Sequence, residues 1–227
     1  MWSSFAADGF ELVASVVGPE EVDWLRRTLE SLPEAPGHRD LLRRFPTVAD
    51  LASSRKILGL LHLRTGRTCF PVRSIFFDKT PESNWLVPWH QDLTIAVKER
   101  IEREGYGPWS IKNGTVHVQP PLEILEGMIA VRLHLDDTDE DNGALRVIPG
   151  SHKLGRLDAT AISVERARTK EVSCPAQRGD ILLMRPLLLH ASSPAVRPTH
   201  RRVIHLEYAS CPLAEGLEWA EALPEAH

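Results

Sequence analysis

The sequence contains few cysteines and no long apolar run, and both absences narrow the class of protein. Its three cysteines, Cys69, Cys174 and Cys211, are odd in number and far apart, which argues against a disulfide framework and against a CxxC zinc site. No run approaches the roughly 20 apolar residues that a membrane span needs. A net charge of -4 gives no electrostatic reason to expect binding to nucleic acid or to an anionic membrane.

Neither end of the sequence resembles a targeting signal. Residues 1–8 have no basic start followed by a long apolar core, so we expect no signal peptide. Residues 224–227 read Pro-Glu-Ala-His rather than Ser-Lys-Leu, so we expect no peroxisomal address. Because the sequence also has no internal repeat or linker, residues 1–227 are predicted to form a single domain. The three scattered cysteines suit a reducing cytoplasm, where we expect the protein to be located.

The first third of the chain, residues 1–68, is predicted to be mostly helical. Apolar residues alternate over residues 10–16, which indicates one early strand. Residues 19–32 carry an apolar stripe with helical spacing and begin with Pro19 and two acidic residues, as helices often do. A second helix is expected from a capping box at Thr47 to Gly66. This third is expected to support the rest of the fold.

The remaining chain changes to strand patterns separated by turns. Strands are predicted at residues 72–77, 128–135, 181–184 and 203–208. Such strands without repeated helical crossovers favour a mainly β fold with flanking helices, in which residues 69–210 form an antiparallel double-sheet jelly roll. Residues 94–119 have little pattern and several glycines, so we expect a long loop that covers part of an active site.

The pattern His-x-Asp occurs three times, and in a strand its two side chains point to the same face. The three pairs are His38/Asp40, His90/Asp92 and His134/Asp136. The first pair follows a Pro-Gly dipeptide and reads as a solvated loop. Spacing alone does not separate the other two as a metal-binding pair, because a buried histidine paired with an aspartate is often only a satisfied core pair.

A more distant histidine and arginine complete a possible oxygenase site. Two imidazoles and one carboxylate can occupy one face of an octahedral Fe(II), leaving three positions for a bidentate acid and O₂. His190 is a candidate third ligand, and Arg201, eleven positions later, can bind the far carboxylate of such an acid through two hydrogen bonds. Arg202 is the alternative anchor, because adjacent residues of a strand point to opposite faces.

Two segments together resemble the phytanoyl-CoA dioxygenase family. They are Trp89-His90-Gln91-Asp92 and residues 141–152, which read DNGALRVIPGSH and resemble the family's NG-x-L-x-x-x-PGSH segment. In that family the metal-binding His-x-Asp precedes this segment, as His90/Asp92 does here, whereas His134 lies on the strand just before it. The resemblance covers roughly residues 70–210.

The resemblance implies a double-stranded β-helix fold, Fe(II), 2-oxoglutarate as co-substrate and O₂. It makes His90, Asp92 and His190 the metal ligands and catalytic centre. It further implies that Arg201 binds the distal carboxylate of 2-oxoglutarate and that Ser192 hydrogen-bonds it.

Other candidates for the pocket rest on strand faces and residue type. Arg73 and Lys79 share a strand face and can meet a second carboxylate, of the co-substrate or of a substrate. Arg132 shares a face with His134 and is a candidate substrate contact. Trp89 and Trp109, together with Trp85, are candidate pocket walls, although tryptophans are more often simply packed. Ser151 and His152 are expected to organise their turn.

The expected reaction is hydroxylation of a small, possibly acidic, organic substrate with release of succinate and CO₂. Related halogenases have a small residue at the position of Asp92, so its presence favours hydroxylation over halogenation. Two other classes stay open: a cupin-like metal enzyme without oxidative chemistry, for which Arg201 is dispensable, and a non-catalytic binding protein on the same barrel. The expected partner is a small molecule, with no nucleic acid or membrane, and the protein is expected to be a monomer or homodimer.

Overall fold

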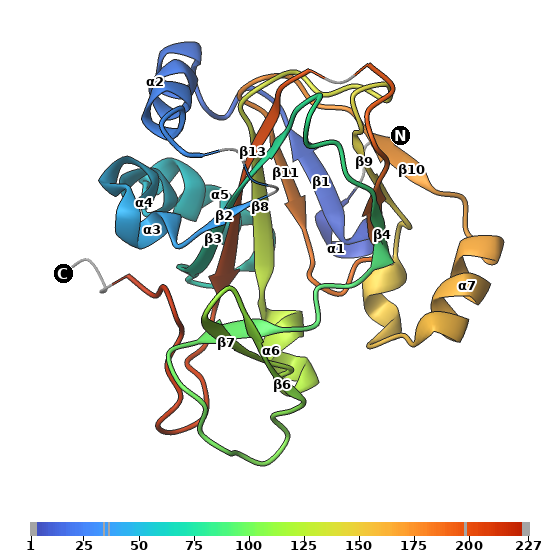
Figure 1. Ribbon diagram of the computed structural model, residues 1–227. Helices are drawn as coiled ribbons and strands as arrows, with labels where there is room; N and C mark the ends of the chain where they lie inside the picture. Colours follow the sequence, from blue (N-terminus) through green and yellow to red (C-terminus); the bar gives the residue numbers. More distant parts are fainter. Residues whose placement is uncertain (1–3, 34, 36, 198, 224–227) are drawn as a thin grey trace.

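The computed structural model describes residues 4–33, 35, 37–197 and 199–223 (Figure 1). The sequence features discussed at residues 1–3 and 224–227 lie outside this range. The helices are α1 Phe5–Asp8, α2 Pro19–Leu29, α3 Leu41–Arg44, α4 Pro46–Ala52, α5 Arg55–Thr65, α6 Leu122–Gly127, the 3-10 helix η1 Ser151–Leu154 and α7 Ala159–Arg168. None of the helices in the described range has the length and apolarity to cross a membrane.

Within the described residues, thirteen strands form three antiparallel sheets. The major sheet has the order β1-β11-β8-β13-β3-β2 and the minor sheet β10-β9-β12-β4. A third, small sheet has the order β5-β7-β6. The strands are β1 Phe10–Val13, β2 His38–Arg39, β3 Phe70–Lys79, β4 Val87–His90, β5 Ile95–Val97, β6 Trp109–Lys112, β7 Thr115–Val118, β8 Ile129–His134, β9 Leu145–Val147, β10 Val172–Cys174, β11 Ile181–Met184, β12 His190–Ser192 and β13 Arg201–Ala209.

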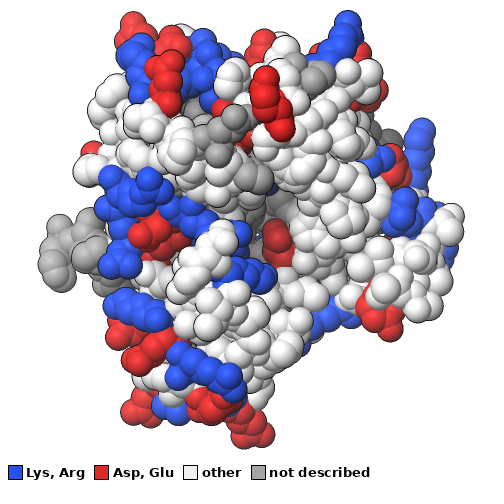
Figure 2. Space-filling model, viewed as in Figure 1, with Lys and Arg blue, Asp and Glu red and all other residues white. Residues whose placement is uncertain are grey.

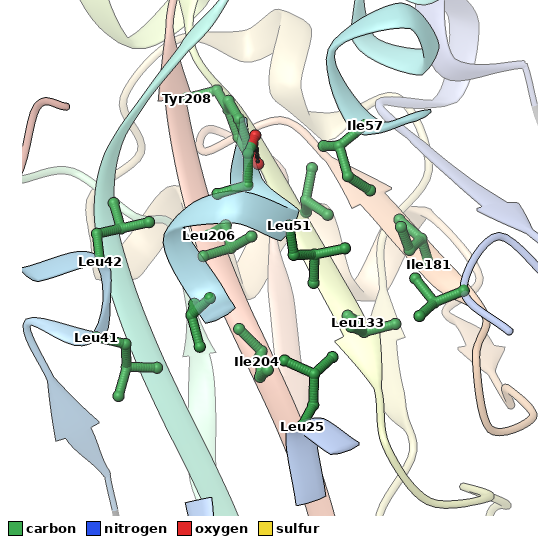
Figure 3. Packing of buried hydrophobic residues seen from close by; sticks show 14 of the residues in the cluster. Leu25, Leu41, Leu42, Leu51, Ile57, Leu133, Ile181, Ile204, Leu206 and Tyr208 are labelled. Atoms are coloured by element: carbon green, nitrogen blue, oxygen red, sulfur yellow. Dashed lines mark hydrogen bonds between the residues drawn. The ribbon is translucent and has the colours of Figure 1, made fainter. Parts of the chain in front are cut away.

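The two faces of the major sheet contact different parts of the molecule. One face packs under helices α2 to α5, which lie together on one side of the sheet in Figure 1. On β13 this face carries Ile204, Leu206 and Tyr208, which pack against Leu25 and Leu51 of the helices (Figure 3). Burying side chains of this size contributes about 1.5–3 kcal/mol each to folding. The other face is free to turn polar side chains toward the minor sheet.

The expected mainly β fold with flanking helices and a jelly-roll core is confirmed, but three local expectations are wrong. The helix expected over residues 47–66 is two helices, α4 and α5, because Ser53 and Ser54 break the pattern and Ser54 caps α5 by accepting a hydrogen bond from Ile57 N at 3.4 Å. The early strand β1 ends at Val13. The segment 94–119, expected to be a loop, contains the three-stranded β5-β7-β6 sheet.

Candidate metal centre and co-substrate pocket

The minor sheet brings His90, Asp92 and His190 together. β4 and β12 are antiparallel neighbours, and His90 and His190 are direct partners in their register. Asp92 follows β4 immediately, and its backbone N–H donates to the carbonyl of Pro186 at 2.8 Å, four residues before His190. One ligand atom from each of the three side chains lies within 4.8 Å of the others. Strand pairing therefore brings three potential metal ligands together, although His190 lies about a hundred positions after His90 and Asp92 in the sequence.

Both imidazoles have their metal-binding nitrogen free. Nδ1 of His90 lies 2.8 Å from the carbonyl oxygen of Pro88, and Nδ1 of His190 lies 2.9 Å from that of Leu188. A carbonyl only accepts, so Nδ1 carries the hydrogen and Nε2 keeps its lone pair. Each Nε2 lies 3.7 Å from an oxygen of Asp92. The three side chains have the donor set and the tautomers that a ferrous ion requires.

The ionisation states suit a divalent cation. Burial raises the pKa of Asp92, but His190 and His90 beside it outweigh that effect and bring the pKa to about 2. Burial lowers the pKa of His190 to about 4, against the opposing attraction of Asp92. At neutral pH the carboxylate is therefore ionised and the buried imidazole neutral, and no proton has to leave before a metal ion binds.

Gln91 fixes the segment between two of the ligands. Its side chain points away from them, is 6% exposed and uses both ends of its amide. Nε2 donates to the carbonyls of Gly155 at 2.8 Å and Leu187 at 2.7 Å, and Oε1 accepts from the N–H of Leu157 at 2.8 Å. These bonds tie the ligand segment both to the chain that precedes His190 and to the loop before α7.

Gln91→Leu is expected to destabilise the protein by about 3 kcal/mol, because one buried and two partly buried backbone groups lose their partner. Metal affinity is expected to fall about tenfold, since support behind the ligands is lost. Chemical unfolding and calorimetry with Fe(II) measure the two effects. Gln177→Leu, at an exposed position, is the matched control, and an unchanged metal affinity in Gln91→Leu contradicts the positioning role.

The turn that contains Ser151 supports the third ligand. The Ser151 hydroxyl donates to the carbonyl of Ile148 at 2.7 Å and accepts from the N–H of Leu189 at 2.8 Å. Leu189 precedes His190 directly, so the Pro-Gly-Ser-His turn helps to hold β12 in place. His152 lies outside the metal cavity and packs against Gly9, where an added Cβ would lie 2.3 Å from its Nδ1.

The competing His-x-Asp pairs have other partners. Asp136 accepts two hydrogen bonds at 2.8 Å from the guanidinium of Arg202, and His134 Nδ1 lies 3.2 Å from the hydroxyl of Thr138. His38 Nε2 lies 2.7 Å from the carbonyl oxygen of Pro33. Neither pair contributes to the cluster of metal donors among the described residues. Arg202 is thereby engaged outside the cavity, whereas Arg201 is buried on the other face of β13.

A cavity of ≈ 200 Å³ lies beside the metal donors, between the major and minor sheets. Both polar and apolar side chains line it. From the major sheet come Arg73, Ile75, Phe77, Arg132, Arg201, His205 and Glu207, with Arg39 from β2. From the minor sheet and its connections come Trp85, Val87, His90, Asp92, Leu145, His190 and Ser192.

Ser192 and Arg201 line this cavity, and Lys79, which is fully buried and not among the lining residues, joins them in a cluster of cations around Ser192. Lys79 Nζ donates to Ser192 Oγ at 2.9 Å and to the Ser193 carbonyl at 2.7 Å. Arg201 Nη1 donates to Ser192 Oγ at 3.2 Å and also to the carbonyl of Gly143. Gly143 has φ +77°, and a Cβ there would lie 2.7 Å from the Ser193 carbonyl oxygen, so the Asn-Gly turn requires glycine. The cluster forms where β3, β12 and β13 meet.

No acidic side chain forms an ion pair with this cluster among the described residues. Burial, then repulsion from Arg201 and Arg132, lowers the pKa of Lys79 to about 7. Burial and Arg132 lower the pKa of Arg201 to about 9. Arg201 Nε is buried without a hydrogen-bond partner. Buried cations that repel one another form a site in which a bound dicarboxylate relieves an existing cost.

The remaining predicted pocket residues occupy different environments. Arg132 lines the cavity, with Nη1 3.2 Å from His205 Nδ1, and Arg73 lines it while paired with Glu207 at 2.8 Å. Trp85 lines the cavity as well. Trp89 is not among the lining residues, and its ring lies beside the guanidinium groups of Arg146 and Arg166. Trp109 lies on β6, where its indole N–H donates to Glu102 at 3.1 Å.

Sequence reasoning missed Arg39. It belongs to a His-x-Asp segment that reads as solvent-exposed loop, yet β2 pairs it with Ile75 of β3 and brings it to the edge of the metal cavity. Two histidines were also not predicted: His205, which lines the metal cavity, and His117, which lines a second cavity on the side of β2. No local sequence pattern marks Arg39 as a cavity residue, because its position depends on the pairing of β2 with β3, more than 30 positions away.

The fold and the site together are those of the double-stranded β-helix class of metalloproteins, with two histidines and one carboxylate as candidate ligands. The chain matches the model of the phytanoyl-CoA dioxygenase (PhyH) family over residues 5–203 and belongs to this family. The resemblance found in the sequence is therefore confirmed and extends into the helical third. No curated protein sequence matches the chain.

Solved structures of similar fold include non-heme enzymes. The epimerase SnoN from nogalamycin biosynthesis, in complex with Fe3+, alpha ketoglutarate and nogalamycin RO, has a TM-score of 0.73 at 17% identity, covering 99% of this chain and 89% of its own. The carbocyclase SnoK has a TM-score of 0.72 at 14% identity, covering 99% and 87%. HygX from Streptomyces hygroscopicus, with nickel and 2-oxoglutarate bound, has a TM-score of 0.65 at 18% identity, covering 90% and 84%. These likenesses establish the fold.

Proposed function

We propose that the protein is an Fe(II)- and 2-oxoglutarate-dependent dioxygenase that hydroxylates a small acidic substrate. One observation carries the proposal: three convergent metal donors and a buried cation cluster without ion-paired acids border the same cavity. A cupin-like enzyme without oxidative chemistry needs the first feature but not the second. A binding protein without a reaction needs neither.

Each part of the site has a task in this reaction. Fe(II) with 2-oxoglutarate supplies the coupling of O₂ reduction and oxidative decarboxylation, which yields succinate and CO₂, to oxidation of a substrate C–H bond. His90, Asp92 and His190 would hold the ion through two imidazole nitrogens and one carboxylate. Arg201 and the Ser192 hydroxyl bind the distal carboxylate of 2-oxoglutarate, and Lys79, behind Ser192, orients that hydroxyl and adds positive charge.

The substrate side of the cavity supports an acidic ligand. Arg132 lies in the cavity wall, is 7% exposed and has a buried Nε without a hydrogen-bond partner. The acidic groups of the cavity are Asp92, assigned to the metal, and Glu207, paired with Arg73. A carboxylate or similar group of the substrate would neutralise Arg132. Phe77 and Ile75 supply the apolar wall that packs against the carbon skeleton.

Anaerobic titration of the Fe(II)-loaded protein with 2-oxoglutarate tests this function. A keto acid that chelates ferrous iron gives a weak visible charge-transfer band, so we expect a saturable band in the native protein. His90→Ala is expected to lose it, and His134→Ala, in the competing motif, to keep it. Arg201→Ala should need a much higher 2-oxoglutarate concentration, whereas Arg202→Ala should behave like the native protein. Absence of the band under verified iron loading refutes the proposal.

A further inference from the structure

A second cavity of ≈ 480 Å³ adjoins the metal cavity on the side of β2. The two cavities share Arg39 and Arg73 in their walls. We call the second one the outer chamber. Its walls come from residues 37–40 and 43–44, which belong to β2 and α3 and their connections, from strands β5 and β7 of the small sheet with the turn before β7, and from residues 220–221. These two arginines therefore border both the metal cavity and the outer chamber.

The outer chamber carries an excess of positive charge. Its basic residues are Arg39, Arg43, Arg44, Arg73 and Lys98, and its acidic residues are Asp40 and Glu221. On the face shown in Figure 2, Lys and Arg side chains gather beside the central hollow, over the part of the molecule that holds α3 and β2 in Figure 1. Charge of one sign in a concave site attracts a ligand of the opposite sign.

Three of the five basic residues already have an acidic partner. Arg73 is paired with Glu207, Lys98 with Glu218 and Arg43 with Asp40. Arg39 and Arg44 form no ion pair among the described residues. Arg44 is exposed and donates a hydrogen bond only to the backbone carbonyl of Arg39, at 3.4 Å. The free positive charge of the outer chamber therefore centres on two residues.

Of these two residues, Arg39 gives the stronger evidence for an anion site. Its Nε and Nη1 atoms are buried and have no hydrogen-bond partner. A guanidinium in this state loses hydration without compensation, which is costly unless a ligand supplies the acceptor. Burial and then repulsion from Arg73 lower the pKa of Arg39. Both facts describe a residue that is prepared for an anion and that lines both cavities.

We propose that the outer chamber binds an oxyanion group of the substrate, held by Arg39 and Arg44, while the carbon to be oxidised lies beside the metal donors. This inference rests on the proposed function for the reaction but not for the oxyanion site itself. It gives the small acidic substrate a phosphate-like or carboxylate group that lies away from the oxidised carbon, in addition to any group that Arg132 binds. Arginine suits both groups through its paired N–H donors.

Calorimetry with inorganic phosphate tests the chamber in metal-free protein. Arg201→Met removes the competing anion site of the metal cavity and is expected to keep phosphate binding. Arg39→Gln and Arg44→Gln are each expected to weaken it at least tenfold in that background. Arg166→Gln, on the exposed face of α7 outside both cavities, is the matched control. Because Arg44 is exposed, its variant keeps the test valid if Arg39→Gln folds poorly.

Unchanged phosphate affinity in both Arg39→Gln and Arg44→Gln overturns the inference, and so does loss of binding in Arg201→Met alone. A parallel titration with tricarballylate in place of phosphate distinguishes the two oxyanions: tighter binding of the tricarboxylate assigns a carboxylate, and tighter binding of phosphate assigns a phosphate. The outcome is separate from the iron titration, because the phosphate experiment contains no metal and no 2-oxoglutarate.

Discussion

Replacing Asp92 by alanine is expected to lower Fe(II) affinity by at least about 100-fold and to abolish turnover. Loss of a residue behind a metal ligand already costs 10–100-fold, and Asp92 is itself the only anionic donor of the candidate centre. The two remaining imidazoles bring no negative charge that could balance the charge of the ion. Calorimetry with Fe(II) under anaerobic conditions measures the affinity, and succinate formation measures turnover.

Asp136→Ala is the matched control for this experiment. It removes a carboxylate from the other strand-borne His-x-Asp pair and breaks the ion pair with Arg202. Stability is expected to fall, but Fe(II) affinity should not change. Equal loss of affinity in Asp92→Ala and Asp136→Ala would falsify the assignment of the ligands.

Asp92 also decides the expected product. Its carboxylate lies 3.7 Å from Nε2 of each candidate ligand histidine and would hold the metal as the third protein ligand, in place of a halide. Under ¹⁸O₂, the native protein is expected to give a product with one labelled oxygen, and no chlorinated product in the presence of chloride. A chlorinated product contradicts the hydroxylase proposal.

Much of the fold follows from local pattern in the sequence. On β13, alternation separates Arg201, His205 and Glu207, which line the cavity, from Ile204 and Leu206, which pack under the helices. One face of the strand meets a polar cavity and the other an apolar core, so polar and apolar residues alternate along the sequence. The break between α4 and α5 and the small β5-β7-β6 sheet were not predictable, because both depend on tertiary contacts rather than on periodicity.

The same distinction applies to the site. His90, Asp92 and His190 are visible because their residue types and order resemble a family. Arg39 is not visible, because nothing near it in the chain differs from a surface loop. Its role arises from the pairing of β2 with β3 at the edge of the major sheet. Likewise, the choice between Arg201 and Arg202 needed the contact of Arg202 with Asp136, more than 60 positions away.

Raising the pH from 7 to 9 is expected to weaken 2-oxoglutarate binding by up to about 50-fold, because binding favours the protonated Lys79. The pKa of Lys79 is about 7 in the free protein, so the side chain loses its proton within this range. A bound dicarboxylate attracts the ammonium and raises this pKa, so binding takes up a proton. One proton taken up corresponds to a tenfold change in affinity per pH unit.

The same shift has the opposite sign for stability. The folded pKa of about 7 lies below the ordinary 10.5, so between these values the unfolded chain binds more protons than the folded one. Stability of the ligand-free protein should therefore rise with pH across this window, by up to about 1.4 kcal/mol per pH unit from Lys79. Lys79→Met removes this rise and is expected to stabilise the ligand-free protein at pH 7.

Both effects are measured on one pair of proteins. Calorimetry of 2-oxoglutarate binding to nickel-loaded protein, in two buffers of different ionisation enthalpy at pH 8, gives the proton uptake. Native protein is expected to take up close to one proton and Lys79→Met none. Chemical unfolding at pH 7 and pH 9 gives the stabilities. Equal proton uptake in the two proteins assigns the titration to another group and removes Lys79 from the co-substrate site. Comparison of native protein with Lys79→Met thus tests whether Lys79 increases the affinity for 2-oxoglutarate while it lowers the stability of the ligand-free protein.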